Sequence, residues 1–246
     1  MNIQVISDVH TEFHKDNGTS FLPRLKPAKS IDVLVAAGDI VQLSNKSQST
    51  EFIGKLCSIY PHVVFVAGNH EYYGTSLIKG NNILYELEDT YSNFHFLERS
   101  FTTIKGQRFV GASMWYHQQP FIDATWYKWS DFREISNLFP AYKKYSQDEA
   151  KFLQREVKSS DIVVTHFVPL ECLNHPDYTE SPFNPYFCID QNTLITERKP
   201  KLWIYGHTHY GQRRVLPNGT ITLGNPYGYE PDMLVPMFSY SCIEHV

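Results

Sequence analysis

The sequence predicts an α/β fold that is built on a mixed β-sheet. Short apolar runs rich in β-branched residues recur along the chain, and nearly every position in them is apolar, as in strands buried on both faces. Stretches with the pattern of helices lie between several of these runs, and such alternation is typical of α/β proteins. From Leu202 onwards the pattern changes to strand, turn and strand, which makes the sheet mixed.

Seven runs are predicted as strands, at residues 3–6, 31–36, 62–67, 108–111, 162–165, 201–205 and 220–223. Three stretches are predicted as helices, at residues 50–60, 76–90 and 141–158. Pro217-Asn218-Gly219 combines residues that favour tight turns, so we expect a hairpin at this position.

The composition excludes several classes of protein. A length of 246 residues suits one large domain or two small ones, and we expect a single domain over residues 1–246. The formal net charge is −4 and no run of Lys or Arg exceeds two residues, so we expect no binding of long double-stranded nucleic acid. The four cysteines are not spaced for a zinc or disulfide framework.

Nothing in the sequence indicates a membrane segment or a leader. Met1 is followed at once by the first predicted strand, and no apolar run approaches the length that crosses a bilayer. We therefore expect no membrane partner and a cytoplasmic location. A phage-encoded protein would have the same features.

Two segments, residues 114–140 and 167–188, are irregular. The first is rich in Trp, Tyr and Phe, and the second carries four prolines and several aromatic residues. Long ordered loops in a compact domain often form lids or walls of functional sites, and we expect these two to wall the active site. The alternative is a satellite hydrophobic cluster that covers a helix.

Polar side chains with metal-binding atoms follow five of the predicted strands. Residues i and i+2 of an extended chain face the same way, so Asp8 and His10 can reach one ion, as can His207 and His209. A carboxylate such as Asp39 has two oxygens and can bridge two cations. Ligands of open α/β sheets collect at the carboxyl ends of the strands. We expect one metal centre formed by Asp8, His10, Asp39, Asn69, His166, His207 and His209.

The donor types restrict the metal. Mixed imidazole and carboxylate ligands suit Mn, Fe, Ni, Co or Zn, whereas Mg and Ca prefer oxygen alone. The ligand set contains no cysteine, which argues against a structural zinc site. We expect two divalent ions, with Mn first and Fe, Zn, Ni or Co as alternatives.

The five motifs, in their order along the chain, resemble the signature of the calcineurin-like metallophosphoesterase superfamily; they are Asp8-Val9-His10, Gly38-Asp39, Gly68-Asn69-His70, Thr165-His166 and Gly206-His207-Thr208-His209. The segments at residues 68–74, 129–133 and 225–229 are similar to a branch of small bacterial and phage phosphohydrolases. The resemblance implies a four-layer αββα sandwich with mixed sheets and a dinuclear metal site at the carboxyl ends of the strands.

The resemblance also implies two groups of ligands, one for each ion: Asp8, His10 and His209 for the first, and Asn69, His166 and His207 for the second. Asp39 would bridge the ions, and Asn69 and His70 would contact the substrate phosphate. His70 would act as a catalytic group that is not a ligand. A hydroxide that bridges the ions would attack phosphorus.

Two positions depart from the family pattern. The family often has a second Asp three residues after the bridging one, and here that position is Gln42, which is neutral. His70 would then act as a hydrogen-bond donor more than as a strong acid. The Asp-Arg-Gly extension of Ser/Thr protein phosphatases is absent after Asp39, which argues against a dedicated phosphoprotein phosphatase.

The resemblance implies hydrolysis of a phosphomonoester or phosphodiester. A nuclease or a cyclic-nucleotide phosphodiesterase would use the same site. A non-catalytic scaffold is a third hypothesis, but such proteins commonly lose metal ligands and none is missing here. Arg133 is a candidate for a further phosphate contact, and the alternative for Arg133 is a surface pair with Asp131 or Glu134.

Overall fold

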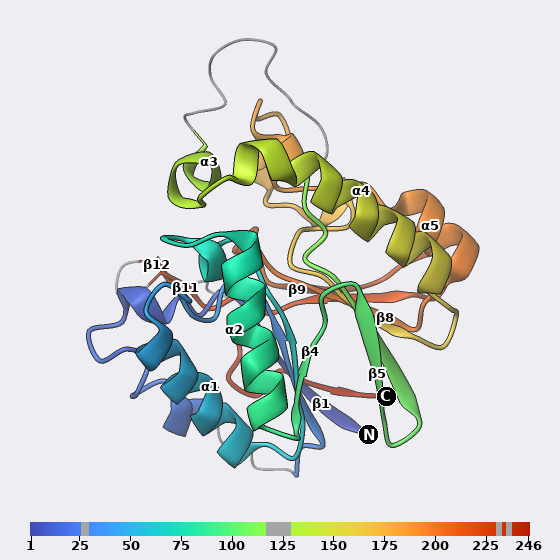
Figure 1. Cartoon of the computed structure of the whole chain (residues 1–246). Coiled ribbons are helices and arrows are strands. Elements are labelled where there is room, and N and C mark those ends of the chain that lie inside the picture. Colours follow the sequence, from blue (N-terminus) through green and yellow to red (C-terminus); the bar gives the residue numbers. More distant parts are fainter. Residues whose placement is uncertain (26–29, 117–128, 230–232, 235–237) are drawn as a thin grey trace.

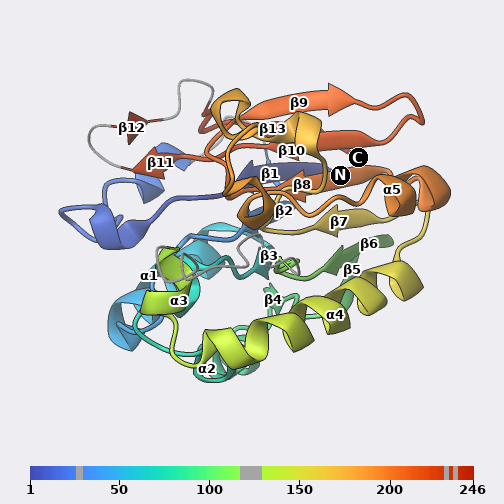
Figure 2. The ribbon, with the colours of Figure 1, turned by 90° about the horizontal axis from the view of Figure 1, so that it is seen from above.

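Two β-sheets pack face to face, and helices cover the outer face of each. The computed structural model describes residues 1–25, 30–116, 129–229, 233–234 and 238–246. Helices α1 (Lys46–Ile59) and α2 (Leu77–Thr90) lie on one side of the sheets, and α4 (Leu138–Glu156) and α5 (Asn192–Arg198) lie on the other (Figures 1 and 2). The result is the four-layer αββα arrangement, which confirms the expected fold class.

Both sheets are mixed. The first has the strand order β13-β1-β2-β3-β4, with bounds Ile243–His245, Asn2–Ile6, Val33–Ala37, Val63–Val66 and Phe94–Phe96. The second has the order β5-β6-β7-β8-β10-β9, with bounds Ser100–Ile104, Gln107–Gly111, Ile162–Val164, Leu202–Tyr205, Ile221–Gly224 and Gln212–Val215. Only β13, β5 and β9 run antiparallel to their neighbours in these two sheets. A separate pair is formed by β11 (Gly228–Tyr229) and β12 (Met233–Leu234).

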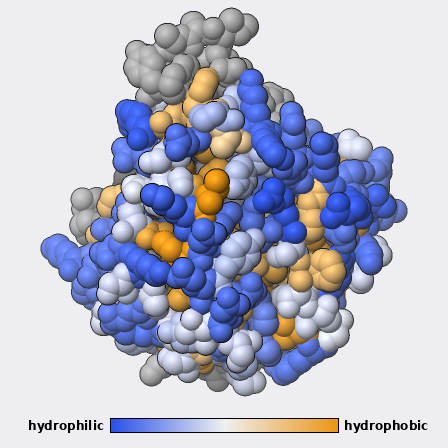
Figure 3. Space-filling view, viewed as in Figure 1, coloured by the Kyte–Doolittle hydropathy of each residue, from blue (hydrophilic) through white to orange (hydrophobic). Residues whose placement is uncertain are grey.

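The strands are apolar at successive positions because both of their faces are buried. In β2, Val33, Val35 and Ala37 belong to the core between the sheets, whereas Leu34 and Ala36 belong to the core under the helices. Burial of such side chains contributes roughly 25 cal/mol per Å² of apolar surface. The face of the molecule in Figure 3 is mostly hydrophilic, and its apolar residues form small separate groups.

The seven predicted strands and three predicted helices are all present, and the expected hairpin joins β9 to β10. Helix α1 begins four residues earlier than predicted because Asn45 caps it and accepts a hydrogen bond from the Gln48 backbone. Helix α4 begins before Pro140, since a proline is tolerated in the first helical turn, where backbone N–H groups lack helical partners. Strands β4, β5, β9, β11, β12 and β13 and helices α3 (Ser130–Glu134) and α5 were not predicted.

None of the helices in the described ranges is both long enough and apolar enough to cross a bilayer.

Candidate metal centre

The central strands of both sheets deliver polar side chains to one edge of the sandwich. Strands β1, β2 and β3 of the first sheet end just before five of these residues, and β7 and β8 of the second sheet end just before the other three. The residues are Asp8, His10, Asp39, Asn69 and His70 from the first sheet, and His166, His207 and His209 from the second. All are buried except His209, whose side chain is 19% exposed.

The backbone turns sharply at these strand ends. Five of the residues have left-handed backbone conformations, with φ of 52° at Asp8, 51° at His10, 56° at Asp39, 70° at His207 and 49° at His209. Such conformations cost free energy for residues other than glycine, and they cluster at functional sites. The chain therefore holds these side chains in strained positions that packing alone would not select.

The glycines of the motifs allow the strand ends to approach closely. A Cβ atom on Gly68 would lie 2.2 Å from Asp39 Oδ1, and one on Gly38 would lie 2.3 Å from His166 Nδ1. Both distances are far below any real contact, so only glycine fits at either position. The glycine in each of these two motifs thus follows from how closely the strand ends pack in space.

The side chains form two neighbouring groups. Asp8, His10 and His209 form the first: His209 Nε2 lies 3.4 Å from Asp8 Oδ1 and 3.1 Å from His10 Nε2. Ligand atoms of the members of this group lie within 4.8 Å of one another. These three residues are the set that the sequence resemblance assigns to the first ion.

The second group contains Asp39, His166 and His207, whose ligand atoms also lie within 4.8 Å of one another. His166 Nε2 lies 3.3 Å from Asp39 Oδ2 and 3.1 Å from Asn69 Oδ1. The same oxygen of Asp39 is 3.8 Å from His10 Nε2. Asp39 therefore lies between the two groups, where a bridging carboxylate belongs.

The donor set fits two divalent cations. Two imidazole Nε2 atoms 3.1 Å apart, as in His10 and His209, can share one proton or bind one cation through both lone pairs. Burial opposes ionisation of Asp39, but His166 and His70 outweigh it and hold the pKa of that carboxyl well below its usual value. The centre therefore combines anionic oxygen with imidazole nitrogens, and a divalent transition metal would bind these nitrogens in place of their protons.

Backbone and side-chain partners orient the candidate ligands. His166 Nδ1 lies 2.9 Å from the carbonyl oxygen of Ala37, so its Nε2 faces the centre. Glu71 is buried beneath the site and accepts hydrogen bonds from the backbone N–H groups of Asp39 and Gly68 at 2.8 Å and 2.6 Å. Glu71 was not among the predicted site residues, although it directly follows the Gly-Asn-His motif.

Asp131 is a second buried carboxylate that the sequence analysis did not assign to the site. It accepts hydrogen bonds from the Asn69 amide at 2.9 Å, the Tyr73 hydroxyl at 2.7 Å and the Trp129 indole at 2.9 Å. The aromatic segment at residues 129–133 pointed to this region, but only the fold shows that Asp131 contacts Asn69. Arg133 is exposed on helix α3 (Ser130–Glu134) and is not among the described residues that line the cavity.

His70 is held by Glu12, a third carboxylate that the sequence analysis missed. His70 Nδ1 lies 2.8 Å from Glu12 Oε1, and His10 Nδ1 lies 3.3 Å from the same oxygen. Burial raises the pKa of Glu12, but the hydrogen bonds from His10 and His70 outweigh it and lower that pKa to about 2. Burial lowers the pKa of His70, but Asp39 and Glu12 outweigh it and raise that pKa to about 9.

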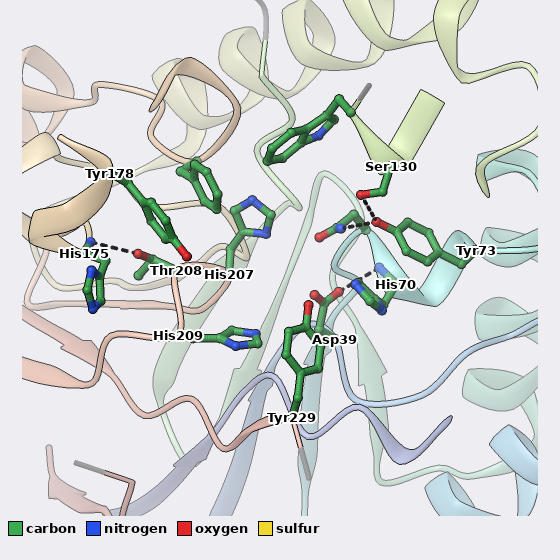
Figure 4. Close-up of a pocket in the computed structure, with 13 residues that line it drawn as sticks. Asp39, His70, Tyr73, Ser130, His175, Tyr178, His207, Thr208, His209 and Tyr229 are labelled. Atoms are coloured by element: carbon green, nitrogen blue, oxygen red, sulfur yellow. Dashed lines mark hydrogen bonds between the residues drawn. The ribbon is translucent and has the colours of Figure 1, made fainter. Parts of the chain in front are cut away.

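A cavity of about 410 Å³ opens over the centre (Figure 4). Asp39, His70, His207 and His209 contribute to its floor. Its walls come from both irregular segments, through Trp129 and Ser130 from one, and His175, Tyr178 and Phe187 from the other. Residues 117–128 of the first segment lie outside the described residues. Both segments therefore contribute to the surface that a substrate would meet.

The wall is largely aromatic. The rings of Tyr178 and Phe187 stack with centroids 4.5 Å apart, and the Trp129 ring stacks on Tyr186 at 4.7 Å. Tyr229 lies beside His209, with ring centroids 4.7 Å apart.

A model of the calcineurin-like phosphoesterase family matches residues 1–211, and the chain belongs to this family. Uncharacterised protein L509 of Acanthamoeba polyphaga mimivirus is 26% identical, over 92% of this chain and 91% of that protein. Human metallophosphoesterase domain-containing protein 1 is 27% identical, over 79% of this chain and 59% of that protein. The chain thus spans less than two thirds of the human relative.

Solved structures share the fold at low sequence identity. Phosphopantetheinyl hydrolase from Mycobacterium tuberculosis has a TM-score of 0.76 and 16% identity, covering 100% of this chain and 95% of that one. A dimetal phosphatase from Danio rerio has a TM-score of 0.52 and 14% identity, covering 93% of this chain and 88% of that one. Family membership supports metal-dependent hydrolysis of phosphoesters as the general activity, with divalent metal ions as cofactors.

Proposed function

We propose that this protein hydrolyses a phosphomonoester or phosphodiester with the help of two divalent cations, and that the ester carries a flat organic group. The observation that supports this most strongly is the convergence of seven metal-binding side chains and His70 at one edge of the sandwich, where several of them line a cavity with an aromatic wall.

Each group of side chains has a role in this proposal. Asp8, His10 and His209 hold one cation, while Asn69, His166 and His207 hold the other, and Asp39 contributes an oxygen to each. Two bound cations supply Lewis acidity, which lowers the pKa of a water molecule towards neutrality and stabilises negative charge on phosphoryl oxygens. Manganese is the metal we expect first, because the donor set mixes imidazole with carboxylate.

His70 is the proposed catalytic group outside the ligand set. Its Nδ1 is engaged by Glu12, so Nε2 is the ring nitrogen that remains for the substrate. From the floor of the cavity, Nε2 can donate a hydrogen bond to a phosphoryl oxygen or a proton to the leaving oxygen.

The aromatic wall supports an ester with a planar group. Aromatic side chains bind flat groups by stacking, as protein aromatics do with nucleobases. Tyr178, Phe187 and Trp129 all line the cavity next to the proposed metal centre. This supports a nucleotide-type ester, including the cyclic-nucleotide and oligonucleotide alternatives. Trp115 and Tyr116, by contrast, are almost fully buried and have packing roles.

The test is hydrolysis of p-nitrophenyl phosphate and bis-p-nitrophenyl phosphate by protein loaded with Mn²⁺, with metal content measured in parallel. We expect turnover of at least one of the two esters and its loss on chelation. Faster turnover of the diester together with cleavage of single-stranded DNA would favour the nuclease. A fully metallated protein that turns over neither ester would favour the non-catalytic scaffold.

A further inference from the structure

We infer that Glu12 is a positioning residue that fixes the ring of His70 and thereby aims its Nε2 at the substrate. This inference rests on the proposed function, because it assigns a partner to the proposed catalytic group of the same site. Glu12 lies in a short 3-10 turn (Thr11–Phe13) that directly follows the first metal-binding motif. The residue is therefore placed by the same strand end that delivers Asp8 and His10.

The geometry of one oxygen atom carries the inference. Glu12 Oε1 lies 2.8 Å from His70 Nδ1 and 3.3 Å from His10 Nδ1. Both rings turn Nδ1 towards this oxygen, which can accept a hydrogen bond from each, so both Nε2 atoms face away from Glu12. The Nε2 of His10 indeed lies 3.1 Å from His209 Nε2, within the first ligand group. The same arrangement leaves the Nε2 of His70 for the substrate.

The other contacts of His70 do not determine which of its ring nitrogens faces the substrate. Its ring stacks on Tyr73 with centroids 4.1 Å apart and meets His10 edge to face at 4.3 Å. Such packing sets the plane of the ring, but it does not distinguish one ring nitrogen from the other. Gln42 turns elsewhere, since its Nε2 donates to the carbonyl oxygen of Tyr73 at 3.1 Å.

The burial of Glu12 points to a role in the site more than in the fold. Its side chain is 13% exposed, and its second oxygen, Oε2, is buried with no hydrogen-bond partner among the described residues. A buried carboxylate costs free energy unless its partners compensate for it. Here the hydrogen-bonding partners of Glu12 are the two site histidines.

The first experiment needs no substrate. ¹H–¹⁵N spectra of the Zn²⁺-loaded protein should show a downfield, slowly exchanging Nδ1–H proton, assigned to His70 by its loss in His70→Asn. We expect this proton to disappear in Glu12→Ala and to persist in Glu12→Gln, which keeps an acceptor oxygen, and in Gln42→Ala. Persistence of the proton in Glu12→Ala would overturn the inference, whether or not the protein proves to be a phosphoesterase.

The second experiment separates the action of Glu12 through His70 from its action through His10. At saturating Mn²⁺, with metal content measured for every variant, we expect Glu12→Ala to lower kcat about 10²-fold, as for loss of a positioned acid–base group. In a His70→Ala background, the same change should lower kcat less than about threefold, because residues that act as a unit are not additive. Gln42→Ala is the matched control. An equal loss in both backgrounds would contradict the inference.

Discussion

The carboxylate of Asp131 lies 2.9 Å from the side-chain amide nitrogen of Asn69, although the two residues are 62 positions apart. Since a carboxylate can only accept, it binds the amide NH₂ group and leaves Oδ1 of Asn69 to face His166, 3.1 Å away. The same carboxylate accepts the indole N–H of Trp129. One buried side chain thus connects a candidate metal ligand to the aromatic wall of the cavity.

We predict that Asp131→Asn lowers the affinity for divalent metal about 10–100-fold, the usual effect of losing a partner that orients a ligand. The amide that this substitution introduces would direct N–H groups towards donors of Asn69, Tyr73 or Trp129, which bind carboxylate oxygens in the unmodified protein. Competition with a chromophoric chelator measures the affinity directly. Glu134→Gln, an exposed change on the same helix, is the control and should have no effect. Unchanged affinity in Asp131→Asn would show that Asn69 keeps its orientation without this partner.

Replacing Asp39 by Asn should remove at least one bound cation and nearly all turnover. Asp39 Oδ2 lies between the two ligand groups, 3.3 Å from His166 Nε2 and 3.8 Å from His10 Nε2. The loss in metal affinity should exceed the roughly 10–100-fold effect of an outer partner. Metal content by mass spectrometry and rates on the p-nitrophenyl esters provide the measurement. A variant with two bound ions and full activity would exclude the bridging role.

The aromatic wall predicts that the protein prefers diester substrates whose non-leaving group is flat. Thymidine 5′-p-nitrophenyl phosphate and methyl p-nitrophenyl phosphate have the same leaving group, so their kcat/KM ratio isolates binding of the flat group. Tyr178→Ala should reduce this ratio about 5–150-fold, the equivalent of one stacking contact. Tyr85→Ala, an exposed aromatic on α2 that does not line the cavity, is the control. An unchanged ratio would mean that Tyr178 does not stack on substrate.

Glu98, a buried acid outside the metal-binding motifs, predicts how stability depends on pH. Burial raises the pKa of Glu98 to about 6 from an ordinary value of 4.5, although Arg99 opposes this shift. Between these two pH values the folded protein binds more protons than the unfolded chain, so stability falls as the pH rises through this window. A shift of this size corresponds to about 2 kcal/mol in the free energy of unfolding.

The side chain introduced by Glu98→Gln cannot ionise, so the stability of this variant should not decrease through this pH window. Relative to the unmodified protein, its free energy of unfolding should rise by about 2 kcal/mol between pH 4 and pH 7. Urea unfolding of both chelator-treated proteins over this range supplies the values, and the difference between them cancels the titration of the metal centre. Glu86→Gln, which makes the same change at an exposed side chain, is the matched control. A flat difference for Glu98→Gln would contradict the prediction.

The sequence predicted the inner strands and not the outer ones, for a physical reason. Most positions of the predicted parallel strands are buried on both faces, so these strands are apolar at nearly every position. The missed strands β4, β5, β9 and β13 are the four edge strands of the two sheets. Edge strands are often short and polar, because one side meets solvent. β9 shows this directly, since Arg213, Arg214 and Val215 are all exposed.

The candidate ligands were predictable because each of them lies just after a strand that the sequence itself indicates. Each follows a buried strand, and parallel strands that end together bring their next residues together. Glu12, Glu71 and Asp131 were not predictable, because their roles depend on partners that only the tertiary fold supplies. Arg133 illustrates the converse, since it lies in a segment that walls the cavity and yet is exposed on α3.

Each ligand group draws its members from both halves of the sandwich. Asp8 and His10 follow β1 of the first sheet, whereas His209 follows β8 of the second. Asn69 likewise belongs to the first sheet and His166 to the second. A cation in either position would link the two sheets, and its binding free energy would oppose their separation. Removal of bound metal would therefore be expected to loosen this end of the molecule first.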